Sequence, residues 1–217
     1  MTVERVAPSS PRRRGPTKGD LKEQAILETC ERLLGERQLR DITVDELAAG
    51  AGLSRPSFYF YFESKDAVLR ALVERIADEM YRESERWLER SDDPPVEIAM
   101  RSFEASARLW REHGPVLRAA NEAWGDDPEM RAFWENTIGR FMRQSARTIQ
   151  GERSAGDAPG GPDPEALAKA LIWMNERCFY TTSLGLGPAL SEEELVPTLA
   201  TVWLRAIYGD VTLPGGA

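Results

Sequence analysis

The apolar residues of this 217-residue chain recur mostly at intervals of three and four positions, the spacing that lines one face of an α-helix. In residues 65–89, for example, Val68, Leu72 and Ile76 fall on one face of the expected helix. No stretch alternates apolar and polar residues convincingly enough for a β-strand. The pattern therefore predicts an all-α protein.

Capping residues locate the first helices. Asp20 is expected to cap the first helix, and Thr43 with Glu46 has the spacing of a capping box at the second. Ser54 followed by Pro56 is typical of a helix N-terminus. Nine helices are predicted, at residues 20–35, 43–49, 54–62, 64–89, 96–113, 115–124, 127–152, 164–184 and 191–209.

The later helices have similar signals. Asp163 precedes Pro164 at the start of one, and Ser191 with Glu194 forms a second capping-box pattern. Pro197 lies inside the last predicted helix and is expected to kink or restart it.

The most informative segment is residues 42–69, in which a glycine turn at 50–52 joins two short helices ahead of a long one. This is the layout of a helix-turn-helix, which places its second helix in the major groove of DNA. Five consecutive aromatic residues at 58–62 cannot all be buried. Phe58 and Phe62 are expected to face the core, and Tyr59 and Tyr61 to face outward.

Polar side chains on this segment have the chemistry that DNA recognition needs, because base edges set sequence and phosphates set position. Ser54, Arg55, Ser57 and Tyr59 are expected near bases, whereas Thr43, Tyr61 and Lys65 are expected at phosphates. The complete predicted set is Thr43, Ser54, Arg55, Pro56, Ser57, Tyr59, Tyr61 and Lys65, with Arg12, Arg13 and Arg14 of the N-terminal arm.

The charge distribution is compatible with this interpretation. The net charge of −8 alone argues against a nucleic-acid partner, but residues 1–20 contain five basic and two acidic residues. A local basic arm can contact the phosphate backbone even when the remainder of the chain is acidic.

Little in the composition indicates catalysis. Cys30 and Cys178 are far apart in the sequence, and the single histidine, His113, has no clustered ligand set. The two cysteines are expected to be small buried hydrophobic residues. No catalytic residue, metal or cofactor is predicted.

The chain has no apolar run close to the roughly 20 residues that a membrane span requires, and its arginine-bearing N-terminus lacks the apolar core of a signal peptide. A cytoplasmic location without a membrane partner is therefore expected.

Large apolar residues gather in residues 96–209, where they could form either a plain core or a cavity for an apolar ligand. The amide of Asn175 requires a hydrogen-bond partner if it is buried among them. The predicted ligand-binding residues are Phe103, Trp110, Trp134, Ile138, Phe141, Trp173, Asn175, Phe179 and Trp203.

The last two predicted helices, 164–184 and 191–209, have apolar faces that are too broad for one packing side. A homodimer that pairs these helices as a four-helix bundle would bury the excess.

The segment from Thr43 to Leu69 resembles the DNA-binding domain of the tetracycline-repressor (TetR) family, on the residues Thr43, Leu47, Ala48, Ala51, Gly52, Leu53, Ser54, Phe58, Tyr59, Tyr61, Phe62, Ser64, Lys65 and Leu69. Residues 54–62, 174–177 and 207–209 with Trp203 are similar to the ethionamide-resistance repressor branch of that family. The resemblance implies a homodimeric repressor that a small hydrophobic inducer releases from palindromic operator DNA. It also implies that Trp134, Phe141, Trp173, Asn175 and Trp203 line the inducer pocket.

The expected domains are a flexible basic arm at 1–19, a helix-turn-helix DNA-binding domain at 20–66, a ligand-binding and dimerisation domain at 67–210, and a flexible tail at 211–217. Ile172 stands where that branch has an asparagine, and Ala99 and Ser106 stand where it has aromatic residues, so a different ligand preference is expected. Two other functions remain open: a constitutive DNA-binding protein without an inducer, and a helical small-molecule enzyme.

Overall fold

The computed structural model describes residues 17–88, 93–125 and 127–209, without the side chains of 84–88. Within these ranges the predicted all-α architecture is confirmed, and no residue is in a β-strand. The elements are α1 (Lys18–Leu34), a 3₁₀ turn η1 (Leu39–Asp41), α2 (Val44–Gly50), α3 (Arg55–Phe58), α4 (Lys65–Leu88), α5 (Pro95–Ala123), α6 (Pro128–Ala155), α7 (Pro164–Ser183) and α8 (Glu192–Tyr208).

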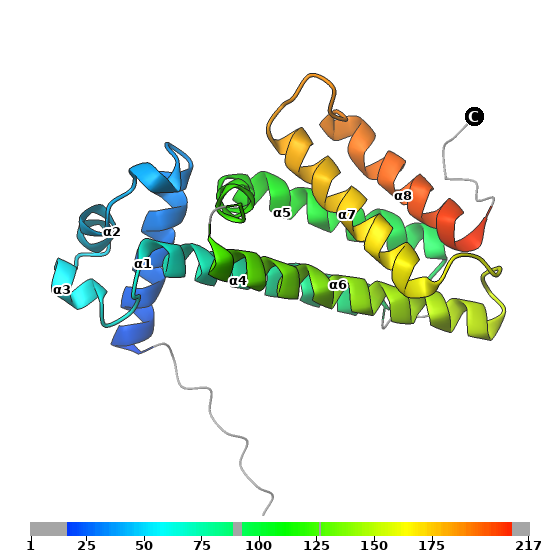
Figure 1. Cartoon of the computed structure of the whole chain (residues 1–217), viewed down its shortest axis with the longest axis horizontal. Helices are drawn as coiled ribbons and strands as arrows, with labels where there is room; N and C mark the ends of the chain where they lie inside the picture. Colours follow the sequence, from blue (N-terminus) through cyan, green and yellow to red (C-terminus); the bar gives the residue numbers. More distant parts are fainter. Residues whose placement is uncertain (1–16, 89–92, 126, 210–217) are drawn as a thin grey trace, which may run out of the picture.

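The helices form two parts, shown in Figure 1. Helices α1 to α3 make a small head at one end, and α4 to α8 make an elongated body. In the body α4 packs on α5, α6 packs on α7, and α8 packs on α5 and α7. Helix α4 also packs on α1, so it belongs structurally to both parts.

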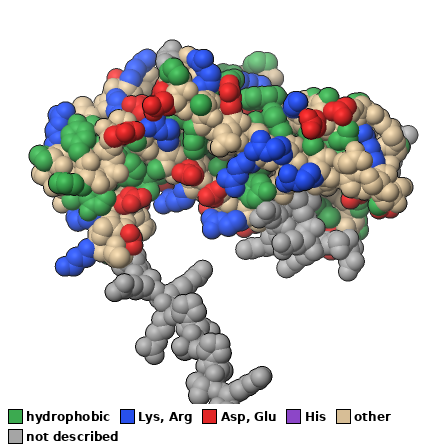
Figure 2. Space-filling model, turned by 60° about the horizontal axis from the view of Figure 1, so that its bottom comes forward, with side chains coloured by type: hydrophobic (Ala, Val, Ile, Leu, Met, Phe, Trp, Pro, Cys, Tyr) green, Lys and Arg blue, Asp and Glu red, His purple; other side chains and the backbone are tan. Residues whose placement is uncertain are grey.

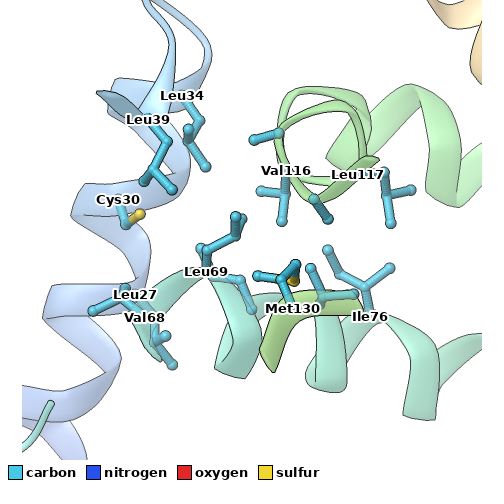
Figure 3. Close-up of a cluster of buried hydrophobic side chains, with 14 of the residues drawn as sticks. Leu27, Cys30, Leu34, Leu39, Val68, Leu69, Ile76, Val116, Leu117 and Met130 are labelled. Atoms are coloured by element: carbon cyan, nitrogen blue, oxygen red, sulfur yellow. The ribbon is translucent and has the colours of Figure 1, made fainter. Parts of the chain in front are cut away.

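One hydrophobic core runs without interruption from the head into the body. Figure 3 shows Leu27 and Cys30 of α1 facing Leu69 of α4, close to Val116 of α5 and Met130 of α6. All five side chains are buried. Because burial of a side chain of this size is worth about 1.5–3 kcal/mol, this shared core fixes the head to the body.

Most predicted helix starts are confirmed. Thr43 and Ser191 are N-caps whose hydroxyls accept hydrogen bonds from the backbone N–H of Glu46 and Glu194. Ser54 caps α3, and Asp163 caps α7 with Pro164 in its first turn. The prediction for α1 was wrong by three residues. Its N-cap is Thr17, and Asp20 is the capping-box partner whose Oδ2 accepts from the Thr17 N–H at 2.8 Å.

Two other boundaries differ from prediction. The recognition helix is shorter than 54–62, because α3 ends at Phe58 and residues 59–61 form a turn. The two predicted helices at 96–113 and 115–124 are joined in α5, so there are eight α-helices in the described residues. A break remains at His113 (φ −115°, ψ 15°), two residues before Pro115, which cannot donate to the preceding turn.

The predicted kink or restart at Pro197 was wrong, since α8 is continuous through this residue. Pro197 lies in the second turn, where it removes only one helical hydrogen bond close to the N-terminus. The hydroxyl of Thr201 also donates to the Pro197 carbonyl at 2.6 Å.

Residues 1–16 of the arm predicted at 1–19, including Arg12, Arg13 and Arg14, lie outside the described residues. The tail predicted at 211–217 also lies outside them. No helix in the described part of the chain is both long and apolar enough to cross a membrane.

Candidate functional site

The turn between α2 and α3 is held in a fixed shape. Gly52 has the left-handed φ of 63° that side-chain-bearing residues seldom adopt. The ammonium of Lys22 on α1 donates to the carbonyls of Ala51 at 2.9 Å and Gly52 at 3.3 Å. The turn therefore presents α3 at a fixed angle to α2.

Close packing of α1 on α2 also fixes this geometry. A Cβ atom on Gly50 would lie 2.3 Å from Cγ2 of Thr29, a contact that only glycine avoids. Thr29 is itself buried, and its hydroxyl donates to the Ala25 carbonyl at 2.7 Å. The head therefore has no spare volume where these two helices cross.

The start of α3 presents four of the predicted DNA-binding residues at the surface. Ser54 and Ser57 are joined through their hydroxyl oxygens, 2.9 Å apart. The guanidinium of Arg55 donates to Asp45 of α2 at 2.8 Å. A hydrogen bond with Tyr59 and the charge of Asp45 raise the pKa of Arg55 above its ordinary value. Arg55 is therefore oriented before any ligand arrives, with further N–H groups available to an acceptor.

The aromatic run at 58–62 separates into buried and exposed members. Phe58 and Phe62 are buried as predicted, and Tyr59 is exposed with its ring edge-on to Phe58. Tyr61, which was predicted to face outward, is half-buried, with part of its side chain packed against the core of the head. The chain leaves helical geometry after Phe58, so helical spacing misplaces the residues that follow.

Phe60 was missed in the sequence. It is 88% exposed, more than any other large hydrophobic side chain in the described residues. The run of five aromatic residues signalled that some had to be exposed, but the helix end after Phe58 was needed to identify which ones. Figure 2 shows hydrophobic side chains at this end of the molecule, among basic and acidic ones.

Thr43 lies at the exposed start of α2, where its hydroxyl and its backbone N–H are hydrogen-bonded to Glu46. The Thr43 hydroxyl donates to Glu46 Oε2 at 2.8 Å, and Arg37 donates to Oε1 of the same carboxylate at 2.6 Å. Hydrogen bonds from the Thr43 backbone and side chain, followed by that from Arg37, lower the pKa of Glu46 to about 2. Glu46 therefore fastens the start of α2 to the preceding loop.

Lys65 has a different environment from the one that phosphate binding requires. Its ammonium donates to the carbonyls of Leu39 at 2.7 Å, Arg40 at 3.0 Å and Ile42 at 3.0 Å. An ammonium has three N–H donors, and all three are used here. In this structure Lys65 attaches η1 to the start of α4, and its ammonium has no N–H left for a phosphate.

The body contains a partly open cavity of about 640 Å³ between α4, α5, α6, α7 and α8. Its wall includes eight of the nine predicted ligand-binding residues: Phe103, Trp110, Trp134, Ile138, Phe141, Asn175, Phe179 and Trp203. The volume lies within the range of small-molecule sites, and most of the lining is apolar. The aromatic richness of the C-terminal segment thus corresponds to a hollow as well as to a core.

Trp173 is the one predicted ligand-binding residue that does not line the cavity. The residues of α7 that line the cavity are Ile172, Asn175, Glu176 and Phe179, which follow the spacing of one helical face. Trp173 is offset from this face and stacks instead on Trp124, with ring centroids 5.8 Å apart. Ile172, at which the family resemblance indicated a departure, is in the cavity wall.

Asn175 is partnered within the wall. Its Oδ1 accepts a hydrogen bond from Nε1 of Trp203 at 2.9 Å, which joins α7 to α8. The Nε1 of Trp134, by contrast, is buried and has no hydrogen-bond partner. Since buried N–H groups nearly always have acceptors, this unsatisfied donor is unusual.

Glu176 lines the cavity as well, although it is not among the ligand-binding residues predicted from the sequence. It is only 6% exposed, and its Oε1 accepts from the side-chain amide of Asn121 on α5. Its Oε2 is buried without a hydrogen-bond partner, 3.7 Å from the guanidinium of Arg177. Burial raises the pKa of this carboxyl, against the opposing effects of Arg177 and Asn121.

The two cysteines and the histidine make packing and polar contacts within the fold. Burial raises the pKa of Cys30 to about 12, so its thiol is unreactive, and Cys178 is a partly buried free thiol. His113 contacts Glu31 of α1 through Nδ1. Within the described ranges no cluster of histidine, cysteine and acidic residues could hold a metal ion.

Comparison with known proteins agrees with both parts of the molecule. Residues 26–72 match the family described as bacterial regulatory proteins, tetR family. Residues 99–209 match the C-terminal domain of the transcriptional regulator EthR. The chain is 37% identical over 205 residues to the HTH-type transcriptional regulator EthR of Mycolicibacterium smegmatis, covering 94% of each chain. It is 36% identical to EthR of Mycobacterium tuberculosis over 200 residues, covering 92% of this chain and 93% of the relative.

Solved structures share the fold at lower sequence identity. A TetR-family regulator from Syntrophomonas wolfei has a TM-score of 0.73 at 15% identity, covering 89% of this chain and 98% of its own. SmeT, the repressor of a Stenotrophomonas maltophilia multidrug efflux pump, has a TM-score of 0.71 at 22% identity, covering 89% and 94%. The helix-turn-helix head, the hollow helical body and these relatives together show that the chain belongs to the TetR family of transcriptional regulators and carries the C-terminal domain of EthR.

Proposed function

We propose that this regulator is a ligand-responsive repressor, which binds a palindromic operator as a homodimer and is released when a small hydrophobic ligand enters the body. The cavity of about 640 Å³ is the observation that carries the proposal. A constitutive DNA-binding protein needs no such hollow, and an unfilled cavity of this size lowers stability.

The proposed DNA-reading surface is the exposed part of α3 and the turn after it. Ser54, Arg55, Pro56, Ser57 and Tyr59 would lie in the major groove, where Arg55 can donate two hydrogen bonds to guanine. Phe60 joins this proposal because an exposed apolar ring can contact thymine methyl groups.

The proposed phosphate contacts are Thr43, Tyr61 and the arm with Arg12, Arg13 and Arg14. The exposed position of Thr43 at the start of α2 supports its assignment. Lys65 is left out of the direct contacts, because its ammonium is fully occupied by backbone carbonyls.

The proposed dimer interface uses α7 and α8. Six large hydrophobic side chains are exposed in the described residues, and three of them, Leu184, Leu186 and Val202, lie on α8 or on the segment between α7 and α8. The other three belong to the head. A two-fold pairing through α7 and α8 would cover these residues and set the spacing of the two heads.

The ligand would act through two elements that contact both the cavity and the head. Val73 of α4 lines the cavity one turn from Leu69, which packs on α1. Trp110 and Leu117 of α5 line the cavity on either side of His113, which contacts Glu31 of α1. A ligand that preferred one position of α4 and α5 would change the spacing of the heads.

The test is fluorescence anisotropy of labelled DNA from the promoter beside the gene, titrated with protein at two salt concentrations. Specific binding should survive excess random DNA and weaken as salt rises. Arg55→Ala and Tyr59→Ala should each weaken specific binding by about 1–3 kcal/mol. Arg147→Ala, which removes an exposed charge from α6 in the body, is the matched control and should have no effect.

Unchanged operator affinity in both head variants would overturn the assignment of α3 as the reading helix. Tight binding to operator DNA that no compound with affinity for the cavity reverses would instead favour the constitutive regulator. Size-exclusion chromatography with light scattering tests the dimer, because Val202→Glu should produce monomers if α8 lies in the interface.

A further inference from the structure

The charged residues of the cavity wall all have one sign. Glu83, Asp93, Glu152, Asp157 and Glu176 line it, and none of its lining residues in the described part of the chain is lysine, arginine or histidine. An anionic ligand would therefore meet carboxylates and no cation that could pair with it inside the wall. This repulsion would weaken the binding of ligands that carry a carboxylate or a phosphate.

The five carboxyl groups occupy two places along the cavity. Glu83, Asp93, Glu152 and Asp157 lie where α4 and α6 end and α5 begins, which is the end of the body away from the head. In this group Asp93 pairs with Arg101 at 2.9 Å, and Glu152 accepts from the hydroxyl of Tyr208 at 3.0 Å. Glu176 lies apart from them, in the middle of α7.

Glu176 is the carboxyl best suited to hold a ligand group. Asn121 fixes its Oε1, and Oε2 has no hydrogen-bond donor although it is buried. The ion pair with Arg177 at 3.7 Å is longer than a hydrogen bond, and the Arg177 side chain is half-exposed and lies over the ring of Tyr180. A cationic ligand in the cavity would therefore meet a buried carboxyl whose charge Arg177 balances only in part.

The aromatic side chains of the wall favour the same ligand charge. Trp110 stacks on Phe179 with centroids 6.1 Å apart, and Trp203 meets Phe103 edge-on at 5.9 Å. Phe179 is on the same face of α7 as Glu176. The faces of tryptophan and phenylalanine rings attract cations as well as apolar groups.

We propose that the cavity binds a hydrophobic amine or amidine, whose cationic N–H group is held by Glu176 and whose apolar part lies among Trp110, Phe179 and Trp203. This inference rests on the proposed ligand-binding role of the cavity and specifies the class of ligand. The cation offsets the charge of the buried Glu176 carboxyl, and the apolar part fills the aromatic section of the cavity.

The experiment uses three probes of nearly equal shape: 4-(biphenyl-4-yl)butylamine, the corresponding butanol and the corresponding butanoic acid. Isothermal titration calorimetry on the full-length protein at pH 7, without DNA, gives the three affinities. The amine should bind about tenfold or more tightly than the alcohol, and the acid should bind most weakly.

Two variants identify the carboxyl responsible. Glu176→Gln keeps the size of the side chain and removes its charge, so it should reduce the affinity for the amine to that for the alcohol. Glu165→Gln makes the same change on the same helix at an exposed position that does not line the cavity, and it should leave all three affinities unchanged.

Acid binding as tight as amine binding, no binding of any probe, or an unchanged amine affinity in Glu176→Gln would each overturn the inference. The first two outcomes are measured on the unaltered protein, so they do not depend on the folding of a variant. Release of labelled promoter DNA by the amine is measured separately. Charge-selective binding without release would leave the inference standing and contradict the proposed inducer response.

Discussion

The head and the body differ in how completely their polar groups and their volume are used. In the head, the ammonium groups of Lys22 and Lys65 are occupied by backbone carbonyls, and α1 crosses α2 with no room for a methyl group on Gly50. In the body, five helices surround a cavity of about 640 Å³. Every buried side-chain nitrogen or oxygen without a hydrogen-bond partner in the described residues belongs to the body.

This difference assigns the two parts to different tasks. A surface that reads DNA must keep its hydrogen-bond donors in fixed positions. A closely packed head whose structural lysines are hydrogen-bonded to the backbone does so. A ligand can change an equilibrium only where it interacts differently with two states, and the incompletely packed body offers that possibility. The shared core around Leu69 transmits a change in one part to the other.

The largest expected effect comes from truncating one phenylalanine in each part. Phe58 is fully buried in the head, so Phe58→Ala should lower the free energy of unfolding by about 3–5 kcal/mol. Phe141 is half-buried and faces the existing cavity, so Phe141→Ala should cost clearly less. Urea denaturation followed by circular dichroism, at one protein concentration, measures both. Equal losses would contradict the contrast between a packed head and a hollow body.

A smaller effect is expected from Lys65→Met, which removes a cation that bonds three carbonyls while keeping much of the apolar stem. The head should lose about 1.5–3 kcal/mol of unfolding free energy, the usual worth of hydrogen bonds to a charged group. Arg40→Met removes the same charge from an exposed side chain in the same segment and is the control. If Lys65→Met left stability intact and only flattened the salt dependence of DNA binding, Lys65 would be a phosphate ligand after all.

The contact between α1 and α2 supplies the next test. Gly50→Ala should lower the free energy of unfolding by about 1–3 kcal/mol, because the new methyl group overlaps Thr29. Adding Thr29→Ala should recover part of that loss by removing the overlapping atoms. Differential scanning fluorimetry of the two single variants and the double variant shows the coupling. Strictly additive losses would mean that the two residues do not compete for this space.

Local sequence signals were sufficient for most of the fold. The hydroxyl caps at Thr43, Ser54 and Ser191 each bond the backbone within one turn, so their partners are close in the sequence. The same is true of the glycine turn at Gly52. Such features are readable because both the cause and the effect lie within a few residues.

Sequence was insufficient where the environment of a side chain depends on a residue of another element. Lys65 bonds to carbonyls 23 to 26 residues away, a contact that no local pattern indicates. Trp173 has the composition of a pocket residue but stacks on Trp124 of another element. Glu176 resembled an ordinary charged surface residue until its burial against Asn121 was known. Sequence therefore predicted the cavity, and the structure was needed to assign part of its wall.

The smallest expected effect concerns how the stability of the body depends on pH. Burial raises the pKa of Glu176 above its ordinary value of 4.5, so above that pH the folded state retains a proton that the unfolded state releases. Stability should consequently fall as pH rises from about 4.5 through the folded-state pKa, and then level off. Glu176→Gln removes this proton and should flatten that part of the curve, whereas Glu165→Gln should leave it unchanged. Thermal melts between pH 4 and pH 8 in the absence of ligand provide the measurement. If Glu176→Gln showed the same downward slope as the unaltered protein, the pH dependence of stability would not come from the Glu176 carboxyl.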